Sequence, residues 1–307
     1  MNSSYNLKAA KRDVFLAENN SIKPTISNQL LSTNTVRLKT ADINIRFAEL
    51  GESSNPTVIL LHGVPENLHC WYAVAPMLAK NYHVLALDWP GFGGSEGLAS
   101  SGLYNSQYFA EILVDFMDTL VISKANLVAT DISLLPALLV GLAHPERVLK
   151  LAVMDGIPFP RPQYASWELR SFAKKGSILG KALVSWFPGI SSKIARMKGF
   201  YRGHSIPKEI RQEFSSDGQN KVNQIAFLSY FQNFHIGQAY FEKNAKDLNS
   251  EVLVIWGNQD RFISKKLGVE IAEKLPNAKL KIIDKAGHYV HMDKPNELTA
   301  IVSKFIG

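Results

Sequence analysis

Short apolar runs separated by helical stretches constrain the fold of this chain more than any other feature. The runs TVILL at 57–61, YHVLAL at 82–87 and ANLVA at 125–129 contain no Asp, Glu, Lys or Arg, as expected of strands buried on both faces of a parallel sheet. A helical pattern at 104–120 separates the second run from the third. Strands that alternate with helices form βαβ units. The sequence therefore predicts an α/β fold with a mostly parallel central sheet.

The same reading extends over the rest of the chain. An alternating pattern indicates a hairpin near its start, apolar runs indicate three more strands, and a helix closes the chain. These elements are expected at 35–38 and 43–49 for the hairpin, at 149–154, 251–256 and 279–283 for the strands, and at 297–306 for the helix.

The gap between Met154 and Glu251 is too long for one crossover helix. It contains several helical stretches, at 167–174, 177–186, 208–214 and 220–234. We therefore predict a helical lid at 157–247, inserted into a core formed by 35–156 and 248–307. Residues 1–34 are polar, and we interpret them as an N-terminal extension that is not a domain of its own.

The basic charge of the chain is concentrated in this predicted lid. The net charge is +7, and the segment from Ile157 to Asp247 has 14 Lys or Arg against 6 Asp or Glu, a net +8. The remainder has 20 of the 34 basic and 21 of the 27 acidic residues, a net −1. A solvated helical face explains this pattern. Attraction to an anionic substrate or peripheral contact with a membrane stays open as an alternative, because aromatic residues interleave with the basic ones. No motif indicates nucleic-acid binding.

Composition also limits the compartment and the cofactors. Cys70 is the one cysteine, which excludes an intrachain disulfide and suits a reducing compartment. No apolar run approaches the roughly 18 to 20 residues that span a bilayer, and the N-terminus has no signal-like apolar region. We expect a cytoplasmic protein with no cofactor and no metal, since neither a dinucleotide motif nor zinc-ligand spacing occurs. The sequence leaves the oligomeric state open.

Five motifs follow predicted strands, where open α/β sheets bind their ligands. They are HGVPE at 62–66, DWPGFGGS at 88–95, ATDIS at 129–133, WGNQD at 256–260 and GHY at 287–289. In this order they resemble the motifs of the α/β-hydrolase family over about residues 35–156 and 250–307. The resemblance implies the α/β-hydrolase fold with an inserted helical lid, and a catalytic triad of nucleophile, acid and histidine in chain order.

The position of the nucleophile follows from the small residues that its strained turn requires. Ala129 and Ser133 occupy the two small positions, so Asp131 falls on the nucleophile. A second register agrees, because Asp131 lies 13 residues before His144 of the HPERV phrase, similar to the spacing in the family. Ser133 is the alternative nucleophile, but it would place Asp131 and Leu135 at the small positions.

A carboxylate nucleophile changes the reaction class. It is already ionised and displaces a leaving group at sp³ carbon to form an ester. His288, oriented by Asp260, would then activate the water that hydrolyses the ester, with Asp155 as the reserve acid. The oxyanion would lie against the backbone N–H groups of Val64 and Ile132.

The resemblance is strongest to the epoxide hydrolases among families with this aspartate. The sequences HGVPE at 62–66 and GHYVHMDKP at 287–295 are similar to theirs. Haloalkane dehalogenases usually have Asn at the position of Val64 and Trp at the position of Ile132, and both hold the halide. Haloacetate dehalogenases have Arg at the position of Ile132, where it holds the carboxylate of the substrate. The segment LSYFQN at 228–233 resembles the lid segment that contains a catalytic tyrosine in epoxide hydrolases, although Phe231 falls at the tyrosine position and Tyr230 lies one place earlier.

We therefore predict a cofactor-free, epoxide hydrolase-like enzyme that acts on a small, apolar molecule. His62, Trp71, Tyr230 and Phe231 are the predicted substrate-binding residues. Haloalkane or haloacid dehalogenation is the second prediction. The third is a repurposed member of the fold that binds a ligand or catalyses a non-hydrolytic reaction.

Overall fold

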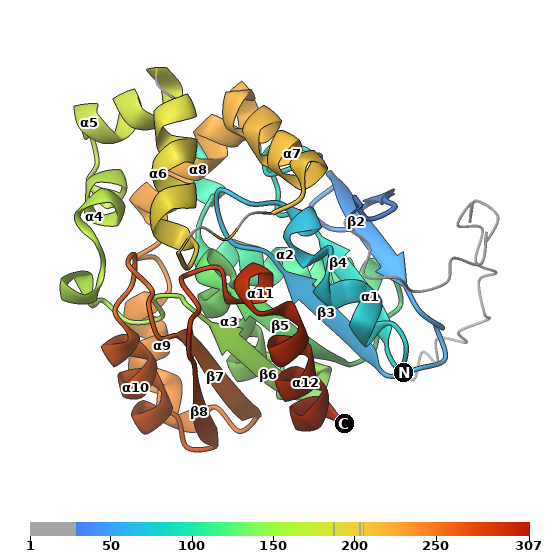
Figure 1. The fold of residues 1–307 in the computed structure, drawn as a ribbon. Helices are drawn as coiled ribbons and strands as arrows, with labels where there is room; N and C mark the ends of the chain where they lie inside the picture. The colour runs from blue at the N-terminus through green and yellow to red at the C-terminus, as the bar shows by residue number, and fades with distance from the viewer. Residues whose placement is uncertain (1–28, 187, 203, 205) are drawn as a thin grey trace, which may run out of the picture.

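The computed structural model describes residues 29–307 except 187, 203 and 205. Within that range the chain forms an eight-stranded sheet with helices on both faces and a group of helices at one end (Figure 1). Residues 1–28 of the predicted N-terminal extension lie outside the described residues, as does Phe187 of the basic segment.

The sheet has the order β1-β2-β4-β3-β5-β6-β7-β8. Its strands are β1 (Asn34–Arg37), β2 (Asn44–Leu50), β3 (Thr57–Leu61), β4 (His83–Leu87), β5 (Ala125–Thr130), β6 (Val148–Met154), β7 (Glu251–Gly257) and β8 (Ala278–Ile283). The pairs β1–β2 and β2–β4 are antiparallel, whereas the pairs from β4 to β8 are all parallel. This confirms the predicted hairpin and the mostly parallel sheet.

Apolar side chains on both faces of the central strands explain why their sequences have no alternating pattern. Along β3, Ile59 and Leu61 belong to one core, while Val58 and Leu60 belong to the other. All four side chains are fully buried. Successive side chains of a strand point to opposite faces, so a strand covered by helices on both sides must be apolar at every position.

The two faces of the sheet are covered by different helices of the core. Side chains of α2, α3 and α10 belong to the core that contains Ile59 and Leu61, and side chains of α1, α11 and α12 belong to the core that contains Val58 and Leu60. The helices are α1 (Val74–Leu78), α2 (Ser106–Thr119), α3 (Leu134–Ala143), α10 (Lys265–Lys274), α11 (Val290–Asp293) and α12 (Pro295–Ile306).

The insertion between β6 and β7 is helical, as the sequence predicts. It contains α4 (Trp167–Ala173), α5 (Ile178–Lys181), α6 (Pro188–Gly199), α7 (Lys208–Gln219), α8 (Lys221–Asn233) and α9 (Gln238–Asn244). In Figure 1, α4 to α8 lie at one end of the sheet. The expected helix at 177–186 is instead α5 followed by a π-helical turn at 182–186.

Two helices of the insertion were not foreseen from the sequence. Helix α6 begins at Pro188 and contains Gly189 and two serines, residues of low helix propensity. Helix α9 contacts α3 of the core, and its Phe241 stacks on Phe159 with ring centroids 5.8 Å apart. The last part of the predicted lid segment therefore packs on the core.

None of the helices formed by the described residues is long and apolar enough to cross a membrane. The cytoplasmic location and the boundaries of the lid stay predictions.

Candidate active site

The turn after β5 places Asp131 at the carboxyl end of the sheet. Asp131 has φ 53°, in the left-handed region that costs a residue with a side chain roughly 1–3 kcal/mol. Neighbouring chain segments approach it closely. A Cβ added to Gly63 would lie 2.7 Å from the Asp131 Cβ, and one added to Gly156 would lie 2.3 Å from the Asp131 carbonyl oxygen. Both positions therefore require glycine, and the turn has the tight packing that the sequence predicts.

Ser133 is a structural residue of this turn and does not lie in the cleft. Its side chain is fully buried. The hydroxyl accepts a hydrogen bond from the Trp89 indole at 2.6 Å and donates one to the His62 carbonyl oxygen. Its proton and one of its lone pairs are engaged by buried partners, and Ser133 is not among the residues that line the Asp131 cavity. This geometry argues against the alternative of Ser133 as nucleophile.

The two carboxylate oxygens of Asp131 have different surroundings. Oδ2 accepts a hydrogen bond from the backbone N–H of Val64 at 2.9 Å, which places Val64 where the sequence predicts an oxyanion-hole donor. Oδ1 lies 3.8 Å from Nε2 of His288. One oxygen is thus held by the backbone, and the other faces the imidazole.

His288 is held on its other side by Asp260. Its Nδ1 lies 2.9 Å from Asp260 Oδ2, while Asp260 Oδ1 accepts the backbone N–H groups of Phe262 and Ile263. The acid is therefore fixed by its own loop and fixes the ring orientation of the histidine in turn. The structure brings together Asp131, Asp260 and His288 as the sequence predicts.

Asp155, the reserve acid, takes a different place. Its Oδ1 accepts a hydrogen bond from the Gly257 N–H at 3.1 Å, and its Oδ2 has no partner among the described residues. Burial and the nearby charge of Asp260 raise the pKa of Asp155 well above its usual range. Asp155 therefore supports the chain before Asp260, and the histidine pairs with Asp260 instead.

Burial and neighbouring charges shift the pKa values of Asp131 and His288, whose side chains face each other. Burial raises the pKa of Asp131 to about 6, against the opposing effects of His288 and of the backbone at Val64 and Ile132. Burial also disfavours the charged form of His288, but the carboxylates of Asp260 and Asp131 outweigh it and raise the pKa of His288 to about 10. Near neutral pH the charged form of His288 is therefore favoured, with Asp131 on one side of its ring and Asp260 on the other.

Asp131 opens into a cavity of about 420 Å³ between the core and the insertion. Most of the lining is apolar, including Ile132, Leu135, Leu169 and Phe234. Arg161, Arg170 and Lys174 line it as well, and Asp131 is the one acidic residue among the described residues that do. The cavity therefore combines a largely apolar surface with cationic side chains near its one carboxylate.

Tyr230 and Phe231 both line this cavity, so the lid segment LSYFQN reaches the site as the resemblance implies. The Tyr230 phenol is buried and donates to the Ile132 carbonyl oxygen at 2.8 Å, with the Ser106 hydroxyl 2.7 Å away. Burial raises the pKa of Tyr230 above its usual range, which keeps the phenol protonated and able to donate.

Tyr289 is a site residue that the sequence reasoning did not identify. It lines a smaller cavity of about 40 Å³ together with Asp131, Val64 and His288, and its ring lies edge-on to His288 with centroids 5.3 Å apart. A Cβ on Gly199 of the insertion would lie 2.1 Å from the Tyr289 ring. Its position directly after the histidine was the only signal in the sequence.

The structure does not place His62 or Trp71 at either cavity. His62 is fully buried, with Nδ1 2.6 Å from the Gly63 carbonyl oxygen and Nε2 accepting the Trp89 backbone N–H at 3.1 Å. Trp71 is fully buried in the core on the α1 and α12 face, with its ring 4.8 Å from His291. Both are loop and core residues, so we correct their prediction as substrate-binding residues.

One group of buried side chains could in principle hold a metal ion. Glu66, Cys70 and His291 offer ligand atoms that lie within 4.8 Å of one another. Glu66 Oε2 and His291 Nε2 lie 3.3 Å apart, and burial raises the pKa of the Cys70 thiol well above its usual value. The contact between Glu66 and His291 joins the loop after β3 to α11.

The comparison with known families agrees with this fold. The family model described as alpha/beta hydrolase fold matches residues 56–295. The chain therefore belongs to the α/β-hydrolase family, and it is a hydrolase of that fold.

Two kinds of enzyme are among the curated relatives. The chain is 26% identical over 288 residues to a 2-hydroxy-6-oxononadienedioate/2-hydroxy-6-oxononatrienedioate hydrolase of Pseudomonas putida, a match that spans 86% of this chain and 92% of the relative. It is 25% identical over 298 residues to human epoxide hydrolase 4, spanning 92% and 81% of the two chains. Epoxide hydrolase 3 of Xenopus tropicalis is 24% identical over 289 residues, spanning 88% and 77%.

Solved structures share the fold at lower identity. Cfl2 from Burkholderia cenocepacia has a TM-score of 0.79 at 20% identity and covers 91% of this chain and 97% of its own. A loop variant of a haloalkane dehalogenase from Bradyrhizobium elkanii has a TM-score of 0.75 at 20% identity, covering 90% and 96%.

The structural role of Ser133 predicts the effect of Ser133→Ala. The substitution leaves the buried Trp89 indole N–H and the His62 carbonyl oxygen without this partner, and we expect the free energy of unfolding to fall by about 1–3 kcal/mol. Urea denaturation measures the change, with Ser32→Ala at an exposed position as the control. Equal stability of the two variants would contradict the hydrogen-bonding role.

Proposed function

We propose that this protein hydrolyses epoxides through a covalent ester of Asp131. The observation that supports this most directly is that the two carboxylate oxygens of Asp131 have different surroundings. Its Oδ2 accepts the Val64 N–H, its Oδ1 lies 3.8 Å from His288 Nε2, and Asp131 itself lines a largely apolar cavity. This arrangement suits a carboxylate that attacks carbon with one oxygen while the other stays in an oxyanion hole.

In the first step of the proposed reaction, Asp131 Oδ1 attacks an epoxide carbon. The carbon–oxygen bond of the ring breaks, and the alkoxide oxygen takes a proton from an acid of the site. The product is a hydroxyalkyl ester of Asp131. The apolar cavity supports this step, because a poorly hydrated carboxylate is a better nucleophile than a solvated one.

In the second step a water molecule attacks the Asp131 carbonyl carbon, and His288 takes its proton. Conversion of Asp131 to an ester removes one of the negative charges that hold the pKa of His288 high, so formation of the ester makes the neutral imidazole more accessible. The Val64 N–H already lies at the oxygen that becomes the oxyanion. Collapse of the tetrahedral intermediate breaks the ester carbon–oxygen bond. The leaving alkoxide takes the proton from His288 to complete the diol, and the proton left on the Asp131 carboxyl restores the acid of the first step.

Tyr230 is the proposed acid of the first step. It lines the same cavity as Asp131, and its hydroxyl is bonded to Ile132, the residue that follows the nucleophile. Burial raises the pKa of this phenol and makes it a weaker acid, so the proton transfer depends on the strong basicity of the alkoxide that forms when the ring opens. The sequence register left Tyr230 one place before the position expected for an epoxide hydrolase, so this role has to be tested separately from the nucleophile.

The environment of the nucleophile favours epoxides over the two other activities among the similar proteins. Ser133 is engaged in two hydrogen bonds, which argues against serine-based acyl chemistry at this turn. The side chains of Val64 and Ile132 offer no hydrogen-bond donor for a halide. The epoxide hydrolases and the 2-hydroxy-6-oxononadienedioate/2-hydroxy-6-oxononatrienedioate hydrolases cover similar shares of this chain, so coverage does not separate them. The apolar part of the cavity lining suits a small epoxide.

The first test is accumulation of the ester in His288→Gln. This substitution removes the base of the second step and leaves the carboxylate in place, so incubation with a panel of epoxides should add the mass of one epoxide to the peptide that contains Asp131. Peptide mass spectrometry measures it, and Asp131→Asn in the same background is the control. An unmodified peptide with every epoxide, or equal modification in the control, would contradict the proposal.

The raised pKa of Asp131 sets the pH dependence of the first step. Because burial raises this pKa to about 6, the nucleophilic carboxylate is lost by protonation as the pH falls through that value. We expect the single-turnover rate of ester formation to fall about tenfold per pH unit below about pH 6. A rate that stays constant down to about pH 4, near the ordinary pKa of aspartate, would show that burial does not act on Asp131 in this way.

The role of Tyr230 predicts a slower first step in Tyr230→Phe. We expect ester formation to slow by about a hundredfold or more, measured as the rate of adduct formation in the His288→Gln background. Tyr164→Phe changes another phenol of the insertion that does not line the Asp131 cavity, and it should react at the unchanged rate. Equal rates for the two variants would assign the acid to a different group.

A further inference from the structure

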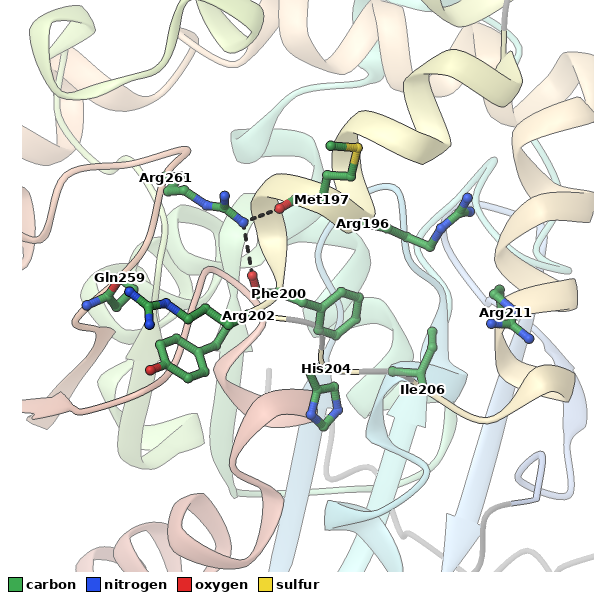
Figure 2. A pocket seen from close by; sticks show the side chains of 10 residues that line it. Arg196, Met197, Phe200, Arg202, His204, Ile206, Arg211, Gln259 and Arg261 are labelled. Atoms are coloured by element: carbon green, nitrogen blue, oxygen red, sulfur yellow. Dashed lines mark hydrogen bonds between the residues drawn. The ribbon is translucent and has the colours of Figure 1, made fainter.

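A second large cleft of about 540 Å³ lies outside the Asp131 cavity. It is formed by the end of α6 and the chain that follows it, by α7, and by the loop after β7. In Figure 2, Arg196 and Arg211 lie on one side of the Phe200 ring and Arg202 on the other. Phe200 and Ile206 are buried and provide an apolar base.

The charges of this cleft are all of one sign. Four arginines line it, and no aspartate or glutamate is among the described residues that do. Arg261 is used within the protein, because its guanidinium donates to the backbone carbonyl oxygens of Met197, Lys198 and Phe200 at the end of α6. Such a contact satisfies carbonyl groups that the helix leaves unpaired.

The other three arginines have no such use. Within the described part of the chain, Arg196, Arg202 and Arg211 form no ion pair or hydrogen bond through their side chains. Guanidinium groups that share a concave surface without carboxylates raise the local concentration of anions. Their planar donors match the oxygen geometry of phosphate better than a lysine does.

We propose that this cleft binds a phosphate-bearing anion through Arg196, Arg202 and Arg211. The volume exceeds that of a single phosphate, and the arginines stand on both sides of Phe200, so the occupant has more than one polar group. A soluble phosphorylated molecule and the headgroup of an anionic phospholipid share this chemistry. Met197 lines the same cleft and is 63% exposed, which suits a surface next to lipid.

The cleft is connected to the catalytic loops through the backbone. The carbonyl oxygen of Gly199, directly before Phe200, accepts the backbone N–H of His288 at 2.7 Å. Arg261 directly follows the triad acid Asp260 in the chain. A ligand held between Arg196 and Arg202 would therefore lie against chain that also contacts the loops of Asp260 and His288.

The experiment compares two variants of equal net charge. The first, R196Q/R202Q/R211Q, removes the unpaired arginines of the cleft. The second, K175Q/K243Q/K246Q, removes three charges from the same predicted lid at positions that line neither this cleft nor the Asp131 cavity. Thermal unfolding first establishes that both variants fold as the parent does.

Binding is measured in two ways at low ionic strength, because salt screens exposed charges. Titration calorimetry uses inorganic phosphate and inorganic pyrophosphate. Sedimentation uses phosphatidylcholine vesicles with and without phosphatidic acid. We expect the parent and the lysine variant to bind and the arginine variant to bind at least about tenfold more weakly, a difference of roughly 1.4 kcal/mol.

The pattern of binding identifies the source of the phosphate. Binding of pyrophosphate without binding to the phosphatidic acid vesicles supports a soluble ligand, and binding to those vesicles with the same dependence on the arginines supports a lipid headgroup. The proposal is wrong if neither probe binds the parent protein, or if the arginine variant binds as tightly as the lysine variant. These results are independent of whether Asp131 forms an ester, so the two proposals fail separately.

Discussion

The left-handed turn at Asp131 is the constraint on which the rest of the site depends. A residue with a side chain is unstable in this conformation by itself, so the surrounding packing has to enforce it. Gly63 and Gly156 bring two other strand ends against the turn, and Ser133 joins it to the loops of His62 and Trp89. Three segments that are far apart in the sequence thus meet at one residue and direct its carboxylate toward the cavity.

The same packing determines the electrostatics. Because the turn lies under the insertion, Asp131 is poorly hydrated, and its pKa rises. The imidazole of His288 compensates part of that cost, and Asp260 stabilises the imidazolium. In the proposed reaction the ester removes the charge of Asp131 and weakens the stabilisation of the imidazolium, so the product of the first step prepares the base for the second. The burial that strains the resting site is therefore consistent with a two-step hydrolysis.

The parts of the structure that could be predicted are those with a strong local pattern. The strands were recognisable because a parallel sheet covered on both faces requires unbroken apolar runs such as TVILL. Asp131 was recognisable because its neighbours must be small.

The sequence could not show where loop side chains point, and for that reason His62 and Trp71 were assigned to the substrate although they lie in the packed interior. Helix α6 was not predicted because its first turn begins with Pro188 and Gly189, which have low helix propensity. Tyr289 was not identified because only the packing of its ring against Gly199 brings it to the site. The basic charge of the insertion was evident, but its concentration in one cleft was not.

The central claim is that Asp131 forms a bond to the substrate and does not merely position a water molecule. A single turnover in ¹⁸O-labelled water, with the enzyme in excess over an epoxide that it hydrolyses, separates these two mechanisms. If the ester forms, water attacks the Asp131 carbonyl carbon, and the label appears in the peptide that contains Asp131 while the first diol is unlabelled. Label in the diol after that first turnover, with none in the Asp131 peptide, would contradict the covalent mechanism.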